Sequence, residues 1–234
     1  MAKKVFIAVG HGGKDPGGVA NGFKEKDVNL VVALAARNEL VRHGVVVGMS
    51  RTTDEDDKTT VKECNAFNPE YAIDIHANKG GGDGAEIYHH YKGGASKSLA
   101  QNIATEIKNA GQNLRNGDSG KNDGLKTKKN ALGKDYFEFI RETKCPAVIV
   151  ETAFLDNKED VKIIDTDAEQ KAMGKAIAKG TLKELGIAYK AEEKPVATES
   201  RKIYRVQVGA YSVKANADAM VKKLKDSGFD AIIV

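Results

Sequence analysis

Four residues in separate segments of the chain have side chains suited to metal-dependent hydrolysis: His11 in VGHGGKDPG, Glu25 in KEKDVNL, His76 in IDIHAN and Glu151 in AVIVETAFL. Two imidazoles and one carboxylate are a sufficient set of protein ligands for a catalytic zinc ion, with a fourth position left for water. A second carboxylate nearby is suited to act as a general base. If the four side chains converge in the fold, the protein is a metallohydrolase.

Short apolar runs alternate with helical patterns along the chain. The runs predict strands and the patterns predict helices, which we place as strands at Val5–Val9, 45–47, 71–75, 85–89 and 147–150 and helices at 27–43, 96–110 and 168–185. This alternation is typical of an α/β fold, in which an open, mostly parallel twisted sheet is covered by helices on both faces.

The predicted strands explain how the four residues would meet. In open α/β sheets, ligand-binding residues gather where strands end and their loops begin. His11 comes two residues after the first strand, and His76 and Glu151 directly follow strands. Glu25 lies at the start of the first helix, and the glycine-rich GGKDPGGVANG before it allows the chain to fold back over His11.

The motifs HGGKDPG, EKDVNL, DIHAN followed by GAEIY, and PAVIVETAFLDN resemble those of zinc-dependent N-acetylmuramoyl-L-alanine amidases of the Amidase_3 type, which occur in bacterial autolysins and phage endolysins. The likeness covers residues 1–187, with the motifs in family order. The resemblance implies that His11, Glu25 and His76 hold one zinc ion and that Glu151 is the catalytic glutamate. It also implies the reaction, which is hydrolysis of the amide between N-acetylmuramic acid and L-alanine in peptidoglycan.

The expected chemistry can be stated in physical terms. Bound zinc lowers the pKa of its water from about 15.7 toward about 7 and polarises the amide carbonyl. Glu151 is suited to accept the water proton and to deliver it to the departing amine. A base must lie near the metal but does not need to bind it, which is why we assign proton transfer to Glu151 and not to Glu25.

The remaining histidines and one acid have simpler interpretations. We expect His43, His89 and His90 to lie away from the metal. Asp74 is interpreted as a solvent-facing strand residue, with a role in orienting His76 as the alternative. Nothing between residues 77 and 110 is long enough for an inhibitory helix over the metal, so we expect an open site.

The segment 116–136 is polar, rich in glycine and long for a loop. Loops of this length are usually functional or disordered. It either walls the substrate groove, with Lys126 and Asn130 contacting stem-peptide carboxylates, or is a flexible solvated loop. Asn78 and Asn157 either bind substrate or only cap turns.

The C-terminal part of the chain has a different pattern. Residues 188–201 are poor in apolar side chains and predict a linker between a catalytic domain at 1–187 and a small module at 202–234. The module resembles the first half of a peptidoglycan-binding SPOR domain, with a βαβ arrangement predicted as a strand at 203–208, a helix at 215–227 and a strand at 231–234. A unit of this size can hardly be stable alone, so we predict that two copies pair to form a homodimer, which would serve dimerisation as well as binding to the cell wall. The alternatives are a disordered remnant or docking onto the catalytic domain.

Composition excludes several classes of protein. Mean hydropathy is -0.44 and no long apolar run is present, so no membrane span is expected. The net charge is +4, and basic residues are not interleaved with aromatics as in nucleic-acid-binding motifs.

The two cysteines, Cys64 and Cys145, sit in unlike contexts and are predicted to be free thiols. The N-terminal apolar stretch is too short for a secretory signal, so we expect synthesis in the cytoplasm and action on the wall after release.

The sequence therefore predicts a zinc amidase that degrades peptidoglycan. One alternative is a catalytically silent peptidoglycan-binding or regulatory protein on the same scaffold. Another is a zinc peptidase or deacetylase that acts elsewhere in the wall. The intact set of four residues argues against the silent protein.

Overall fold

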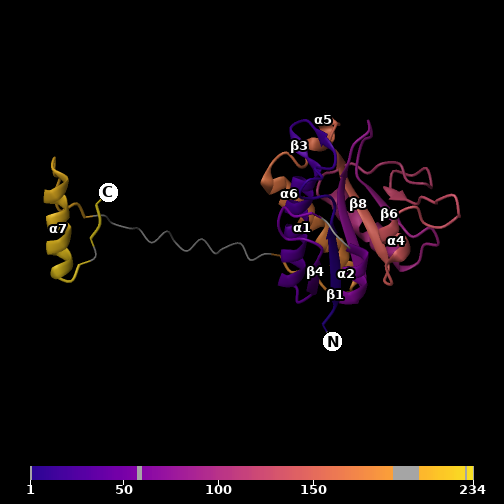
Figure 1. Ribbon diagram of the computed structural model, residues 1–234, viewed down its shortest axis with the longest axis horizontal. Helices are drawn as coiled ribbons and strands as arrows, with labels where there is room; N and C mark the ends of the chain where they lie inside the picture. The colour runs from indigo at the N-terminus through magenta and orange to yellow at the C-terminus, as the bar shows by residue number, and fades with distance from the viewer. Residues whose placement is uncertain (1, 57–59, 192–205, 230, 234) are drawn as a thin grey trace. The chain divides into compact units, whose positions relative to one another are not determined.

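A six-stranded sheet forms the centre of the larger of two units in the computed structural model, which describes residues 2–56, 60–191, 206–229 and 231–233. This unit spans residues 1–190 (Figure 1). The strand order is β4-β1-β5-β8-β6-β7, and the bounds are β1 (Lys4–Val9), β4 (Val46–Met49), β5 (Tyr71–Asn78), β6 (Glu86–His89), β7 (Leu125–Lys126) and β8 (Ala147–Phe154). Among the pairings of this six-stranded sheet, only that of β6 with β8 is antiparallel. The predicted open, mostly parallel α/β sheet is confirmed.

The sheet is covered on both faces because its strands are apolar on both faces. In β1, Val5, Ile7 and Val9 pack into one core, and Phe6 and Ala8 pack into a second core on the opposite face. The first core is completed by helices α1 (Glu25–Arg42), α3 (Ala95–Asn109) and α6 (Asp167–Glu184). The second core is smaller and is covered by α2 (Thr60–Phe67) and α4 (Glu138–Glu142).

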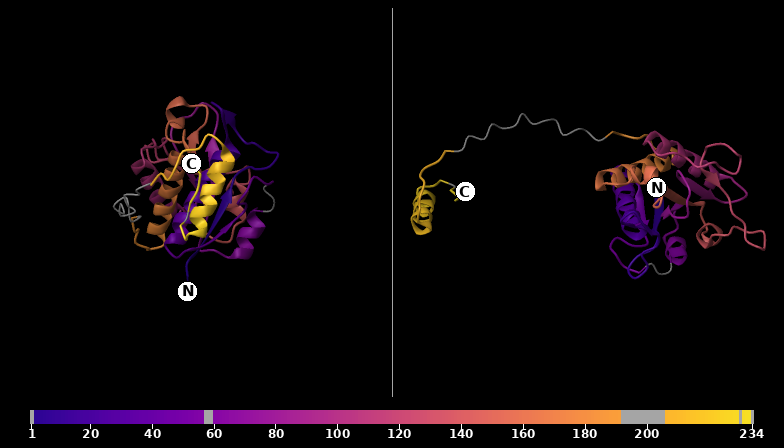
Figure 2. Two further views of the ribbon diagram at one scale, coloured as in Figure 1. Left: turned by 90° about the vertical axis from the view of Figure 1, so that its left-hand side faces the viewer. Right: turned by 90° about the horizontal axis from the view of Figure 1, so that it is seen from above.

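The three long helices match the predicted ranges to within two residues at each end. Helix α6 begins with a capping box, in which the Thr166 hydroxyl accepts from the Glu169 backbone N–H and the Glu169 carboxylate accepts from the Thr166 backbone N–H. Helices α1 and α6 lie side by side on the sheet (Figures 1 and 2). The hydrophobic side chains between these helices fix them over the strands that carry the polar residues.

Strands β5 and β8, which carry two of the polar residues, extend beyond their predicted ends. The polar residues His76 and Glu151 lie within β5 and β8, and do not follow them as the sequence suggested. Both residues continue their strands because their side chains point to the face opposite the main core. The next residue in each strand, Ala77 after His76 and Thr152 after Glu151, is buried. Helix α2, which covers the second face of the sheet, is absent from the predicted helices because its sequence, TVKECNAF, is short and polar.

The two cysteines are free, as predicted, but they are not in unrelated surroundings. Cys64 on α2 is fully buried. Cys145, two residues before β8, packs against the same small core. Their thiols share a hydrogen bond, and this bond, together with burial, raises the pKa of Cys64. The pair therefore joins α2 to the segment that leads into β8.

Short elements complete the larger unit. Two-residue strands β2 (Val19–Ala20) and β3 (Phe23–Lys24) form a hairpin immediately before α1. Helix α5 (Lys158–Val161) follows β8 and is capped by the Asn157 side chain, which accepts from two backbone N–H groups. No helix within the described part of the chain is long and apolar enough to cross a membrane.

The smaller unit spans residues 191–234 and contains helix α7 (Lys214–Asp226), so the helix predicted at 215–227 is confirmed. The two predicted flanking strands are not formed where the structure describes them, at 206–208 and 231–233. The rest of these strands and most of the predicted linker lie outside the described residues. A strand requires a hydrogen-bonded partner and an apolar surface beneath it, and α7 buries none of its residues.

Close packing between α3 and α6 generates a prediction about stability. Alanine in place of helical glycine normally stabilises a protein by up to about 1 kcal/mol. A Cβ atom at Gly180, however, would lie 2.5 Å from the Ile103 Cα atom. We therefore expect Gly180→Ala to destabilise the protein by about 1–3 kcal/mol in urea denaturation. The exposed variant Lys183→Ala is the control, with a change within about 0.5 kcal/mol; stabilisation by Gly180→Ala would contradict the tight contact.

Candidate metal centre and active site

Three side chains from three segments converge at one end of the sheet. Glu25 Oε2 lies 3.2 Å from His11 Nε2, and Glu25 Oε1 lies 3.0 Å from His76 Nδ1. One donor atom from each residue lies within 4.8 Å of the other two. The two imidazole rings meet edge to face with their centroids 5.2 Å apart. The fold thus brings together two ring nitrogens and a carboxylate that are far apart in sequence.

Local structure explains how each residue reaches this point. His11 follows β1 and has φ of 61°, a backbone conformation that turns its side chain back across the strand end. Glu25 is the first residue of α1, and its carboxylate also accepts from the backbone N–H groups of Gly18 and Ala77, at 2.8 and 3.1 Å. The Glu25 side chain is 7% exposed. The carboxylate is therefore fixed by contacts from every side.

In each imidazole ring, the nitrogen that does not face Glu25 contacts the carboxylate of an aspartate. His11 Nδ1 lies 2.8 Å from Asp15 Oδ2, and His76 Nε2 lies 3.3 Å from Asp74 Oδ1. Each ring therefore has one nitrogen directed at Glu25 and the other at an aspartate. This arrangement is the one that orients imidazole ligands in metal sites. Asp74 is not the solvent-facing residue that the sequence favoured, since its side chain is only 14% exposed and contacts His76.

Two glycines are required by the closeness of these side chains. A Cβ atom at Gly10 would lie 2.2 Å from the His76 ring. A Cβ atom at Gly17, whose φ is 65°, would lie 2.6 Å from the His11 ring and 2.7 Å from Glu25 Oε2. The glycine-rich segment after β1 therefore turns the chain and also leaves room for the imidazole rings of His11 and His76.

The charges of the three residues are strongly coupled. Burial by itself raises the pKa of Glu25, but hydrogen bonds from His11 and His76 outweigh it and hold this pKa well below its usual range. The hydrogen bond to Glu25 raises the pKa of His11. Burial opposes protonation of His76, yet Asp74 and Glu25 raise its pKa well above the ordinary value. The Glu25 carboxylate therefore favours the protonated, positively charged form of both rings.

Glu151 lies beside this group on the next strand. It is the register partner of His76, and neighbouring strands are about 4.8 Å apart. Both residues line a cavity of about 1130 Å³ whose walls come from α2, α4 and the face of β5 and β8. Burial raises the pKa of Glu151 to about 7. A carboxyl group with this pKa can accept and release a proton near neutral pH.

Sequence reasoning missed one residue beside Glu151. Glu86 on β6 is its antiparallel register partner and is 3% exposed. Glu86 Oε1 accepts from Asn78 Nδ2 at 2.9 Å and from the Tyr88 hydroxyl at 3.1 Å, and Glu86 Oε2 lies 3.5 Å from Arg115 Nε. The signal in the sequence was the acid in GAEIY, which occupies an inward position of an apolar strand.

Four of the other predicted residues make structural contacts. His43 accepts from the Lys190 backbone N–H, and His90 pairs with Asp135. The Asn130 side chain accepts from two backbone N–H groups of its own loop, and Asn157 caps α5. Within the described residues, the only group able to hold a metal ion is the one formed by His11, Glu25 and His76. The structure has no helix between residues 77 and 110 other than α3.

Comparison with known proteins gives a consistent result. Residues 5–183 match the family model of N-acetylmuramoyl-L-alanine amidases, and residues 178–234 match the SPOR domain model. The sporulation-specific N-acetylmuramoyl-L-alanine amidase of Bacillus subtilis is 34% identical over 238 residues, which cover 99% of this chain and 84% of that protein.

Two solved structures show the same fold. Cwp6 from Clostridium difficile aligns with a TM-score of 0.73 and 34% identity, over 79% of this chain and 30% of that chain. The N-acetylmuramoyl-L-alanine amidase AmiC2 of Nostoc punctiforme aligns with a TM-score of 0.66 and 30% identity, over 79% of this chain and 97% of that chain.

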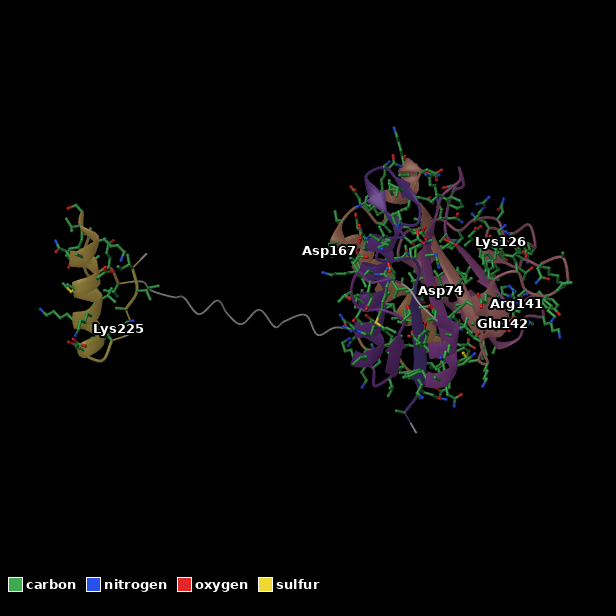
Figure 3. The ribbon with its side chains drawn as sticks, viewed as in Figure 1. Asp74, Lys126, Arg141, Glu142, Asp167 and Lys225 are labelled. Atoms are coloured by element: carbon green, nitrogen blue, oxygen red, sulfur yellow. The ribbon has the colours of Figure 1, made fainter. Side chains whose placement is uncertain are left out.

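The contact between Asp74 and His76 generates a prediction (Figure 3 labels Asp74). The negative charge of Asp74 raises the pKa of His76, so Asp74→Asn will lower that pKa. The measurement is an NMR pH titration of the imidazole in metal-free protein. Glu63→Gln, an exposed change on α2, is the control and should leave the His76 titration unaltered. Identical titrations in wild type and Asp74→Asn would contradict the contact.

Proposed function

The chain belongs to the N-acetylmuramoyl-L-alanine amidase family, whose reaction is amide hydrolysis in peptidoglycan, and we propose that it carries out this reaction with one zinc ion held by His11, Glu25 and His76. The observation that carries the proposal is the convergence of two imidazole nitrogens and one carboxylate oxygen within 4.8 Å of one another. The bond cleaved is the amide between N-acetylmuramic acid and L-alanine.

The donor set fits zinc better than the common hard cations. Magnesium and calcium prefer shells made of oxygen atoms, whereas two histidines and one carboxylate are a familiar set for catalytic zinc with an open position. Contact with Glu25 raises the pKa values of His11 and His76, which supports a site suited to positive charge. Asp15 and Asp74 would keep the ligand nitrogens directed inward.

The roles of the protein groups follow from their positions. Zinc would supply Lewis acidity, by activating water and polarising the amide carbonyl. Glu151 lies beside His76 without belonging to the group of ligands, so it is placed to accept a proton from water and to pass it to the leaving amine. Its pKa of about 7 suits both directions of transfer. The cavity of about 1130 Å³ beside it has room for a sugar and the first peptide residues.

We further propose that residues 1–187 form the catalytic domain, residues 188–201 a linker and residues 202–234 a wall-binding module. The SPOR match at 178–234 supports peptidoglycan as the ligand of the C-terminal part. This part is basic, with seven Lys or Arg residues against three Asp in residues 201–234. Such a surface suits an anionic polymer.

Zinc-dependent hydrolysis is tested on purified bacterial cell walls. Wild type should clear a wall suspension, a chelator should stop clearing, and added zinc should restore it. Glu151→Gln should retain full metal content while activity falls by at least about 100-fold, because proton transfer by a general base contributes about 10²-fold to 10⁴-fold. Product analysis should find whole stem peptides with a new L-alanine amine.

The outcomes separate this proposal from its rivals. A catalytically silent wall-binding protein would leave the suspension turbid while still binding to it. A peptidase or deacetylase would release different products. A Glu151→Gln variant as active as wild type would remove Glu151 from the mechanism.

Homodimerisation through the smaller unit is a separate proposal. Its described residues expose apolar side chains that include Val206, Val208, Phe229 and Ile232, which are 56–85% exposed, and a second copy could cover them. Light scattering should give the full chain twice the monomer mass, and deletion of residues 191–234 should reduce it to one monomer. A full chain with the mass of one monomer, or a deletion variant that is still a dimer, would contradict this.

A further inference from the structure

A second cavity, separate from the one beside Glu151, lies at the β6–β7 side of the sheet. Its volume is about 610 Å³, and its lining is polar. Two cationic side chains, Arg115 and Lys126, face it, and the amides of Asn116 and Asn122 add further hydrogen-bond donors. A cavity with these donors suits an anion with planar or forked oxygens.

The cations in this cavity are not fully neutralised by the protein. Arg115 Nε lies 3.5 Å from Glu86 Oε2, and its terminal nitrogens have no carboxylate partner among the described residues. Lys126 is half-buried and forms no ion pair with any residue that the structure describes. The acid in the lining, Asp83, is engaged by Asn157 Nδ2 at 3.4 Å and by a hydrogen bond with Asp160. The side of the cavity formed by Arg115 and Lys126 is therefore available to an anionic ligand.

The strand register places this cavity in line with the metal centre. His76, Glu151 and Glu86 are register partners across β5, β8 and β6, so their side chains share one face of the sheet. Lys126 on β7 is the partner of Tyr88, two residues beyond Glu86 on the same face. Figure 3 shows Lys126 on the β6 side of Asp74. Glu86 connects the two sites, because it lies beside Glu151 and contacts Arg115.

The separation fits a short peptide. Three strand spacings lie between β5 and β7, which gives about 14 Å at about 4.8 Å per spacing. An extended chain advances about 3.3 Å per residue, so about four residues span this distance. A peptide attached at the scissile amide would therefore bring its second to fourth residues to Arg115 and Lys126.

We propose that Arg115 and Lys126 form a subsite for a carboxylate of the peptide part of the substrate, about two to four residues from the amide that is cut. This inference rests on the proposed function, since it takes the peptide to extend from the metal centre. Lys126 acts on binding, and it has no part in the chemical step.

The test compares two synthetic N-acetylmuramoyl tetrapeptides that differ only in whether the peptide carboxylates are free or amidated. With metal-loaded full-length protein, the free form should have a KM about 5-fold to 10-fold lower than the amidated form, as expected for a partly buried charged hydrogen bond. Lys126→Gln should reduce this difference with kcat nearly unchanged, since only Arg115 then remains, and Lys126→Arg should retain it in full. Lys121→Gln, an exposed lysine of the same loop outside the cavity, is the matched control and should behave as wild type.

A binding measurement separates this proposal from the proposed function. Titration of the metal-free full chain with the free peptide, followed by calorimetry, should give a Kd that Lys126→Gln weakens by the same factor. Equal KM values for the two substrates in wild type, or discrimination that is undiminished in Lys126→Gln, would overturn the subsite. Failure of wild type to cleave either substrate, with peptide binding still dependent on Lys126, would reject the proposed function and leave the subsite standing.

Discussion

The interaction on which the site depends is the contact of one buried carboxylate with two imidazoles. Glu25 is almost excluded from water, and an isolated charge in such a position would be costly. Its two oxygens face His11 and His76 and also accept backbone N–H groups. Because hydrogen bonds from the two rings hold the pKa of this carboxylate low, the centre favours positive charge.

The rest of the larger unit serves to hold that contact in place. Helix α1 carries Glu25 at its first residue, and packing of α1 against α6 and the sheet fixes where that residue stands. Strand β5 carries His76 and strand β8 carries Glu151 in register beside it. The crowding around Gly10 shows how little freedom remains. A shift of either strand by one residue would turn its polar side chains into the main core.

Much of this could be predicted from the sequence, and the failures have physical reasons. The long helices and the central strands are visible because their apolar residues recur with the helical or strand period. The ends of β5 and β8 were placed too early because His76 and Glu151 interrupt apolar runs, although a strand with one polar face permits such residues. Glu86 was overlooked because it is a single acid in an apolar segment, and only the antiparallel pairing of β6 with β8 places it opposite Glu151.

The positions of the two outer aspartates have a further consequence. Asp74 precedes His76 by two residues on one strand, and Asp15 follows His11 by four residues in one loop. Each imidazole thus carries its own orienting acid within a pentapeptide, and the direction of each ring is encoded locally. Tertiary folding then brings the two acid–imidazole pairs to the two oxygens of Glu25. Sequence changes elsewhere in the domain can therefore be tolerated, because the orientation of each imidazole ring depends on a short stretch of chain.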